Sequence, residues 1–390
     1  MPEQPTAPRT AGPATFGPVG PIEHERFVEQ RSASYLQLPE WARVKPGWES
    51  EGLGWRDAEG TVIGTALVLY RKIPYIGRSL AYLPEGPVLP WDQVVQNPGP
   101  WLSPLLSHLK GKGAFSVRMG PIVRRRHWGT ATAKAGLADP ALTDFAQLPP
   151  DTDDPLGARV ADLLARSGWR TLGSDGGFVA GQPDYVIQVP LVDRSLEQLR
   201  ASLNQEWRRN ITRAEKSGVK VRLGGREDLS TFHALYAETA GRDGFTPRPE
   251  RYFHGMWDAF ASGSSGQGDK PSRLRLYLAE LDGEALASSL RVRVGDHVTY
   301  AYGASTGRRR EVRASNAMQW RALTDAFAEG ADVYDLRGIG STLDTNSPLA
   351  GLLRFKLGFG GEVTQYVGEW EYTLSRAWQT ALNTYLKHRP

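Results

Sequence analysis

The sequence predicts an α/β (α+β) fold with two domains, and three observations support this prediction. The chain has 390 residues, which exceeds one typical core because domains average roughly 150 residues. Runs with strand-like and helix-like hydrophobic periodicity alternate along it. After a Pro- and Asp-rich stretch at residues 147–155 this alternation starts again, so we place a domain boundary close to residue 151.

The first half is expected to be mixed helix and strand. Helices are predicted at residues 39–45 and 100–110, and strands at residues 61–70 and 114–119. A Pro- and Gly-rich turn region at residues 83–90 lies between them. Residues 1–21 are rich in Pro, Ala, Thr and Gly and bury too little surface to offset the entropy of ordering, so we expect a disordered tail there.

The second half repeats helices and strands in a recognisable order. Helices are predicted at residues 156–167, 202–218, 229–241 and 314–329, and strands at residues 185–189, 274–281, 286–294, 298–304 and 333–336. Gly-Glu and Gly-Asp turns predict an antiparallel meander for the strands between 274 and 304. The strand, helix and strand order that follows is typical of acyltransferases of the N-acetyltransferase type. The Ser- and Gly-rich residues 262–270 are expected to form a flexible loop.

Composition excludes several classes of protein. The chain has no cysteine, which rules out disulfides, thiolate nucleophiles and cysteine-based metal sites. Its longest apolar run, at residues 62–69, is far shorter than the roughly 20 residues needed to span a membrane. We therefore expect a soluble, cytoplasmic protein that is a monomer by default. The formal net charge is only +4, so the clustering of charge says more than its sum.

A basic helix at residues 202–218 is the most informative local feature. Leu203, Trp207, Ile211 and Ala214 recur at helical spacing and predict one buried stripe. Ser202 and Gln205 are spaced like a capping box, and Gly218 stands where a left-handed C-terminal cap belongs. The other faces carry a cluster of cations: Arg208, Arg209, Arg213 and Lys216. Such a cluster is either a solvated helix face or a site for a phosphate-rich partner.

Common catalytic signatures are mostly missing. There is no Gly-x-Ser-x-Gly elbow, no Walker loop, no dinucleotide-binding glycine motif and no histidine pair at zinc spacing, so we expect no metal. Residues 305–311 (STGRRRE) lack the glycine-spaced loop that would hold the pyrophosphate of coenzyme A, and we expect no cofactor. The three arginines in this segment, Arg308, Arg309 and Arg310, suit a longer polyanion or an exposed loop.

Four segments together resemble the signature blocks of one family. They are residues 35–45 (YLQLPEWARVK), 81–88 (AYLPEGPV), 207–218 (WRRNITRAEKSG) and 353–361 (LRFKLGFGG). In this order they resemble the FemABX family, the nonribosomal aminoacyl-tRNA-dependent peptidyltransferases of peptidoglycan bridge synthesis. The match spans residues 22–376, nearly the whole folded chain, so it is far more specific than any single motif.

The resemblance implies a fold and a reaction. It implies two N-acetyltransferase-like (GNAT) domains packed side by side, the first formed by residues 22–150 plus about 367–390 and the second by residues 151–366. Some members carry a helical hairpin in the second domain; this chain has no room for that coiled-coil arm, so it is similar to the compact, FemX-like form. The implied reaction moves Gly, Ala or Ser from charged tRNA to the side-chain amine of the third stem-peptide residue of a peptidoglycan precursor.

The resemblance also assigns site residues. Lys45, Arg248, Tyr252 and either Tyr300 or Tyr302 are similar to residues that bind the muropeptide precursor. Lys356 and Phe355 are assigned as the catalytic pair, and Lys356 is similar to the lysine at the reacting ester, where its charge would stabilise the oxyanion. The residues alone favour a surface lysine here, between two apolar neighbours. Gly120 stands where the family has an acidic residue, which leaves the general base unassigned.

The implied partners are aminoacyl-tRNA and a lipid-linked or UDP-linked muropeptide precursor. A lipid-linked acceptor would bring the protein into peripheral contact with the inner membrane face. For tRNA we assign the two basic clusters, Arg208, Arg209, Arg213, Lys216 and Arg308, Arg309, Arg310. Two other hypotheses stay open: a non-catalytic RNA-binding module, for which the basic helix suffices, and an aminoacyl-tRNA-protein transferase, for which Lys45 and Arg248 would be dispensable.

Overall fold

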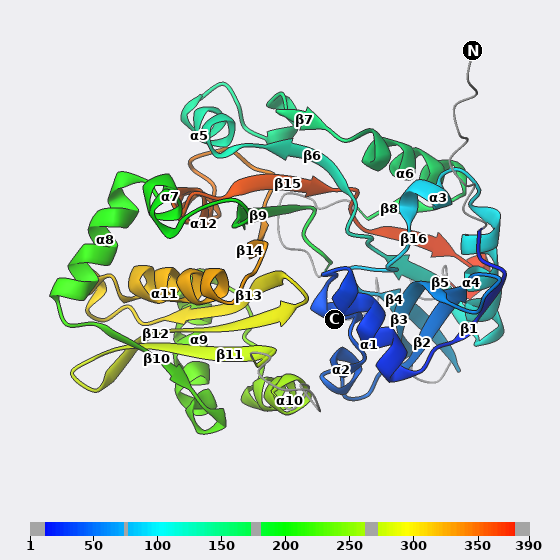
Figure 1. Cartoon of the computed structure of the whole chain (residues 1–390), viewed down its shortest axis with the longest axis horizontal. Coiled ribbons are helices and arrows are strands. Elements are labelled where there is room, and N and C mark those ends of the chain that lie inside the picture. The colour runs from blue at the N-terminus through cyan, green and yellow to red at the C-terminus, as the bar shows by residue number, and fades with distance from the viewer. Residues whose placement is uncertain (1–11, 74–76, 173–180, 262–271, 379–390) are drawn as a thin grey trace, which may run out of the picture.

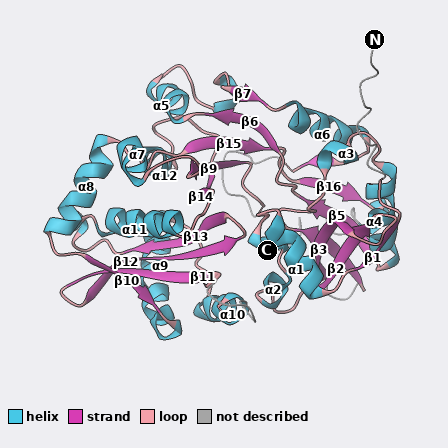
Figure 2. Ribbon diagram, viewed as in Figure 1, coloured by secondary structure: helices cyan, strands magenta, loops and turns pink. Residues whose placement is uncertain are grey.

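A computed structural model describes residues 12–73, 77–172, 181–261 and 272–378. Two β-sheets lie side by side with helices packed against them (Figure 1; Figure 2). The flexible loop predicted at residues 262–270 lies outside the described residues, as do the first 11 residues of the predicted tail.

The first sheet is built from the first half of the chain and its C-terminal segment. Within the described residues it has seven strands in the order β1-β2-β3-β4-β5-β16-β8. Their bounds are β1 Thr15–Pro18, β2 Glu49–Arg56, β3 Val62–Ile73, β4 Arg78–Leu83, β5 Ala114–Met119, β8 Arg170–Thr171 and β16 Trp370–Thr373. The pair β4 and β5 is parallel and the other pairs are antiparallel.

The second sheet has nine strands among the described residues, in the order β10-β11-β12-β13-β14-β9-β15-β6-β7. Their bounds are β6 Arg124–Trp128, β7 Thr152–Asp153, β9 Tyr185–Pro190, β10 Lys220–Gly224, β11 Leu274–Leu281, β12 Glu284–Val294, β13 His297–Ser305, β14 Val333–Ile339 and β15 Glu362–Tyr366. The antiparallel meander β11-β12-β13 is followed by a helix and the parallel strand β14, as predicted.

The helices of the first half precede the strand β9. They are α1 Pro21–Gln30, η1 Tyr35–Gln37, α2 Pro39–Arg43, α3 Trp91–Val94, α4 Gly99–Gly111, α5 Thr130–Ala138, η2 Phe145–Gln147 and α6 Pro155–Arg166. Those that follow are α7 Leu196–Ser202, α8 Gln205–Lys216, η3 Arg226–Asp228, α9 Leu229–Asp243, α10 Glu250–Phe260, η4 Arg310–Val312, α11 Ala314–Ala328 and α12 Ala350–Gly358. The chain passes from α8 through β10 to α9 without a helical arm.

The helices and strands predicted from hydrophobic periodicity are present in the structure. Several elements whose sequences lack a clear periodicity were not predicted. β5 and β11 have the predicted bounds, and each other predicted helix or strand overlaps an observed one. The strand β2 was missed because its glycines and acidic residues have low strand propensity. Gly54 nevertheless suits this strand, because a Cβ there would lie 3.1 Å from the Cβ of Val19 on the neighbouring segment.

Two predictions about the ends of elements were wrong. Residues 15–18 of the predicted disordered tail form β1, which is held by a ladder to β2. Ser202 does not cap the basic helix: Asn204 does, accepting the Trp207 amide at 2.8 Å, while the Ser202 hydroxyl donates to the Leu199 carbonyl. The preceding helix α7 does begin with a capping box, which is formed by Ser195 and Gln198.

The two halves exchange segments and share a core. β6 joins the second sheet, whereas β8 and β16 join the first, so the sheets do not divide at residue 150. A common core cluster contains Tyr35 and Trp41 from the first half and Phe253, Phe260 and Leu290 from the second. The interface between the halves is therefore tightly packed, and a site formed there is held by both.

Candidate active site

Three of the predicted precursor-binding residues meet where the halves join. Lys45 follows α2, and its Nζ lies 4.8 Å from the Trp41 ring centroid and 5.5 Å from that of Tyr252 on α10. The Arg248 guanidinium lies 5.6 Å from the centroid of the same Tyr252 ring. Burial, assisted by the nearby Arg248 charge, lowers the pKa of Lys45 to about 8. Two cations held against aromatic rings form a site suited to a phosphate.

Tyr302 belongs to this group and Tyr300 does not. The Tyr252 and Tyr302 hydroxyl oxygens are 2.9 Å apart. A β-bulge between β12 and β13 pairs Tyr302 with Leu290 but Tyr300 with Arg291, which puts the two tyrosines on opposite faces of the sheet. Tyr300 instead packs against the core of the second sheet. Tyr302 is therefore the residue of the two that faces Tyr252.

Lys356 is not a surface lysine. It shares the buried face of α12 with Leu353 and Leu357 and is only 6% exposed. Its Nζ donates to the main-chain carbonyls of Gly338 at 2.7 Å and Arg337 at 3.3 Å. Burial lowers the pKa of Lys356 to about 7; the Asp335 carboxylate opposes this shift and the Arg337 cation adds to it. The amine can therefore gain or lose a proton near neutral pH.

Phe355 has a structural role in this arrangement. Its ring centroid lies 4.6 Å from that of Trp207 on α8, and its carbonyl accepts the Trp207 indole N–H at 2.9 Å. Phe359 packs on the same indole at 4.7 Å. A Cβ at Gly358 would lie 2.6 Å from the indole, so only glycine permits this approach. The buried stripe of the basic helix thus fixes the helix that carries Lys356.

The two predicted basic clusters lie next to each other, because η4 packs against α8. Five of these cations are exposed: Arg209, Arg213, Lys216, Arg308 and Arg310. Three have partners: Arg208 donates to the Ala201 and Leu203 carbonyls, the exposed Arg308 pairs with Glu284, and Arg309 pairs with Asp282. Figure 1 shows α8 along the outer edge of the second half, where a large partner has access.

Three charged residues of the site were missed from the sequence: Glu85, Asp335 and Arg337. Asp335 is 4% exposed and accepts hydrogen bonds from His297 at 3.2 Å and Gln188 at 3.1 Å. The Arg337 guanidinium pairs with Glu85 at 2.6 Å. Glu85 lies inside the second signature block, which was the available signal, whereas Asp335 and Arg337 lie in a strand that carried no motif.

Gln182 fills the space beside Gly120, the position where the family has an acidic residue. A Cβ at Gly120 would lie 1.9 Å from the Gln182 side-chain oxygen, so Gln182 occupies the position that a longer side chain would need. Gln182 also donates to the Tyr82 hydroxyl at 3.1 Å. Beside Tyr82 lies Glu369, a buried carboxylate whose pKa is raised by burial against the opposing effect of Arg118.

The loop before α11 is occupied by a carboxylate of the chain itself. Glu238 on α9 accepts the Gly307 amide at 2.6 Å and the Thr306 hydroxyl at 2.9 Å. This amide belongs to the segment where an N-acetyltransferase would hold the coenzyme A pyrophosphate. An anion there would meet a carboxylate already in place, which agrees with the sequence-based argument against coenzyme A.

Two relatives in sequence carry the same name. A Lipid II:glycine glycyltransferase of Staphylococcus epidermidis is 24% identical over 412 residues, and the match covers 91% of this chain and 91% of that protein. A Lipid II:glycine glycyltransferase of Staphylococcus aureus is 23% identical over 417 residues, again covering 91% of both.

Solved structures identify the fold. The crystal structure of FemX matches with a TM-score of 0.77 at 21% identity, covering 94% of this chain and 99% of that one. A tandem GNAT protein from the clavulanic acid biosynthesis pathway matches with a TM-score of 0.52 at 11% identity, covering 92% and 98%. The predicted arrangement of two GNAT-like domains is confirmed. The FemAB family matches residues 19–265 and 277–387, nearly the entire folded chain, and this protein therefore belongs to the FemAB family.

Proposed function

We propose that this protein is a peptidoglycan bridge aminoacyltransferase. It moves an amino acid from charged tRNA to the side-chain amine of the third stem-peptide residue of a lipid-linked precursor. The proposal rests on two features present in one protein. One is the group of a cation and aromatic rings formed by Lys45, Tyr252 and Tyr302, and the other is the buried amine of Lys356. The names of the relatives favour glycine as the donor and lipid II as the acceptor.

The reaction needs little chemistry from the protein. The acceptor amine attacks the ester carbonyl carbon of the aminoacyl-tRNA, and the carbonyl oxygen becomes negative in the tetrahedral intermediate. The Lys356 ammonium stabilises that oxygen. The bond to the tRNA ribose then breaks, the acceptor nitrogen loses a proton, and the ribose oxygen gains one. Since the ester is already activated, positioning and this one charge supply most of the rate enhancement.

The proposal is tested by transfer of radiolabel from glycyl-, alanyl- and seryl-tRNA to lipid-linked and UDP-linked precursors, with and without ribonuclease. Ribonuclease-sensitive label from glycyl-tRNA on the third stem-peptide residue is expected. Transfer to a protein amino terminus would favour the protein transferase, and tRNA binding without transfer to any acceptor would favour the RNA-binding module. Either result contradicts the proposal.

Changing Lys45 to methionine is expected to raise the KM for the precursor about 10- to 100-fold, since a charge-assisted hydrogen bond contributes roughly 1.5–3 kcal/mol. kcat should change little. Affinity for the precursor should also fall as pH rises above about 8, where free Lys45 loses its charge. The control is Lys72→Met, which removes an exposed lysine paired with Glu49. If the two changes raised the KM equally, Lys45 would not be a precursor-binding residue.

The double change Arg209→Glu and Arg213→Glu on α8 is expected to weaken tRNA binding at least tenfold and to make it less sensitive to salt. Each lost phosphate contact lowers the slope of log affinity against log salt by about one. Binding is measured by titration of glycyl-tRNA at several salt concentrations. The matched control is Arg159→Glu with Arg166→Glu, two exposed arginines on α6. An equal loss in both doubles would indicate a general charge effect instead of a tRNA site.

A further inference from the structure

An ion pair between the partly buried Arg337 and the buried Glu85 connects the two sheets next to Lys356. Arg337 lies on β14 of the second sheet, and Glu85 lies in the loop after β4 of the first. Their guanidinium and carboxylate atoms are 2.6 Å apart, and the Glu85 side chain is 4% exposed. We infer that Glu85 and Arg337 are positioning residues that hold the Lys356 amine at the reacting ester. This inference rests on the proposed function, because it takes Lys356 to act in transfer.

The main chain of Arg337 contacts Lys356 directly. Its carbonyl, with that of Gly338, accepts the two hydrogen bonds that orient the Lys356 amine. Its amide donates to Asp335 Oδ1 at 2.5 Å, so the same residue also orients a carboxylate that interacts with the Lys356 charge. Any rotation of the peptide units at Arg337 would move the acceptors of Lys356 and the charge of Asp335 together.

The backbone of Arg337 is held in an unfavourable conformation. Its φ is +63°, a left-handed value that residues with a side chain rarely adopt, and it lies at a bulge where the register between β14 and β9 shifts. Such a conformation persists only where the surroundings over-determine it. The ion pair to Glu85 anchors the Arg337 side chain to the first half of the chain, where the guanidinium also lies 5.9 Å from the Tyr35 ring centroid.

The Glu85 end of the pair is fixed as firmly. Glu85 also has a positive φ, +49°, and its carboxylate accepts a short hydrogen bond from the Ser34 hydroxyl. Gln37 ties the loop that carries Glu85 to β3: its side chain donates a hydrogen bond to the Pro84 carbonyl at 2.6 Å and accepts one from the Leu67 amide at 2.9 Å. A rigid carboxylate from the first half therefore determines where Arg337 places its main chain.

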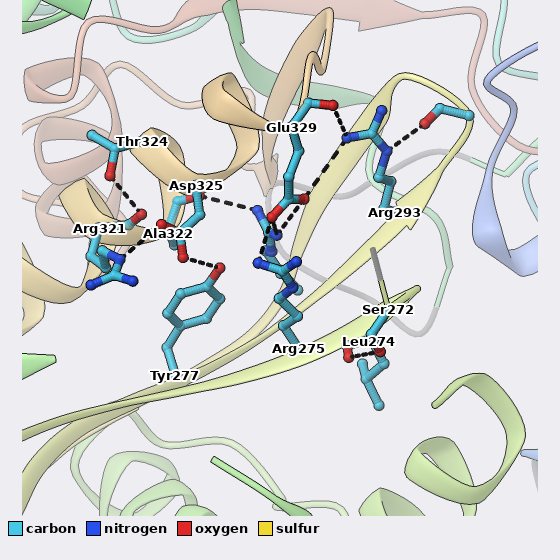
Figure 3. A network of polar contacts seen from close by, with 12 residues as sticks. Ser272, Leu274, Arg275, Tyr277, Arg293, Arg321, Ala322, Thr324, Asp325 and Glu329 are labelled. Atoms are coloured by element: carbon cyan, nitrogen blue, oxygen red, sulfur yellow. Dashed lines mark hydrogen bonds and ion pairs between the residues drawn. The ribbon is translucent and has the colours of Figure 1, made fainter. Parts of the chain in front are cut away.

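A second buried pair offers a matched control. Arg291 on β12 is 2% exposed and binds both carboxylate oxygens of Glu329 at 2.7 Å. Figure 3 shows Glu329 also reaching the guanidinium groups of Arg275 and Arg293, on β11 and β12. These contacts lie between the second sheet and the end of α11. The pair has the same chemistry as the one between Glu85 and Arg337 but does not join the two sheets.

The test compares Glu85→Gln, Arg337→Gln, their double variant and Arg291→Gln. Both single changes at the pair are expected to lower kcat about 10- to 100-fold, because small displacements of reacting groups cost rates of this size. The double variant should lose no more than the worse single, since both remove one interaction. Arg291→Gln should lower the melting temperature yet keep kcat within about threefold of the unchanged protein at temperatures where it is folded.

The Lys356 pKa provides a readout that does not need activity. The charged and titratable groups around the amine are Asp335 and Arg337 from β14, His297 from β13, Tyr366 from β15 and Glu85. Arg337→Gln removes a cation that lowers the pKa of Lys356, so NMR of isotope-labelled lysine should show it rising above about 7. Glu85→Gln keeps the Arg337 cation, so the pKa of Lys356 should not rise in that variant. Arg291→Gln should leave it unchanged.

The outcomes are separable. If Arg337→Gln matches Arg291→Gln in both kcat and the Lys356 pKa, the positioning role is wrong. Should Arg337→Gln fail to fold, Arg337→Lys retains the charge, and it is expected to keep the Lys356 pKa and restore part of kcat; no recovery would also overturn the role. Failure of the unchanged protein to transfer from any charged tRNA contradicts the proposed function alone, since the NMR result still tests the pair.

Discussion

Replacing Lys356 by methionine is expected to lower kcat for transfer about 100- to 1,000-fold, the usual cost of losing one group that stabilises an oxyanion. Methionine matches the length of the lysine and suits the buried face between Leu353 and Leu357. Removing this amine leaves the Gly338 and Arg337 carbonyls without a donor, so we expect the folded protein to lose about 1–3 kcal/mol of stability, and kcat is compared at temperatures where both proteins are folded. Single-turnover transfer from glycyl-tRNA measures the chemical step.

Binding measurements complete this test. Affinity for tRNA and for the precursor should stay within about threefold in Lys356→Met, because the basic face and the Lys45 site do not include Lys356. Lys134→Met is the control, since Lys134 is a half-buried lysine on α5 whose pKa is also lowered by burial. Retention of kcat in Lys356→Met would place the oxyanion contact on another group.

The pH dependence follows from the same lysine. The neutral acceptor amine becomes tenfold more abundant per pH unit up to its pKa of roughly 10.4. The charged form of Lys356 becomes tenfold less abundant per unit above about 7. The logarithm of kcat/KM should therefore rise with unit slope below about 7, level off between about 7 and 8, and fall above about 8, where Lys45 loses its charge. A slope of two below about 7 and of one between about 7 and 8 would mean that neutral Lys356 acts as a base.

Trp207→Ala is expected to have the largest effect on stability. Trp207 is 3% exposed and packs on Phe355 and Phe359, and truncation of a buried tryptophan costs about 3–5 kcal/mol. For 390 residues unfolding together, each kcal/mol lowers the melting temperature by roughly 1 °C, because the entropy of unfolding is about 2.1 cal/mol/K per residue. Activity should also fall at temperatures where the protein is folded, because α8 no longer holds α12 and its Lys356.

Trp207→Phe separates packing from hydrogen bonding. It keeps an aromatic ring but leaves the Phe355 carbonyl without its indole donor, at a cost of about 1–3 kcal/mol. Thermal unfolding and single-turnover transfer are measured for both variants. If Trp207→Ala lost stability but kept full kcat in the folded protein, the contact between α8 and α12 would serve folding only.

The sequence alone predicted the fold class and the pieces of the site. Periodicity located the meander, the helix and the parallel strand that follow one another between residues 274 and 339, because local hydrophobic spacing decides such elements. The family resemblance predicted Lys45, Arg248 and Tyr252 as precursor-binding residues, and the structure brings the three side chains together. The buried stripe of the basic helix was likewise read correctly from the spacing around Trp207.

The tertiary structure alone decided how those pieces act. Lys356 looked like a surface lysine until α12 packed against β14, and one bulge, which no periodicity reveals, sent Tyr300 and Tyr302 to opposite faces. Glu85, in the loop after β4, and Arg337, on β14, belong to different halves of the molecule, and each adopts a left-handed backbone that its residue type does not favour. Local sequence preferences act over a few residues, whereas burial, charge pairing and backbone strain depend on segments that meet only after folding.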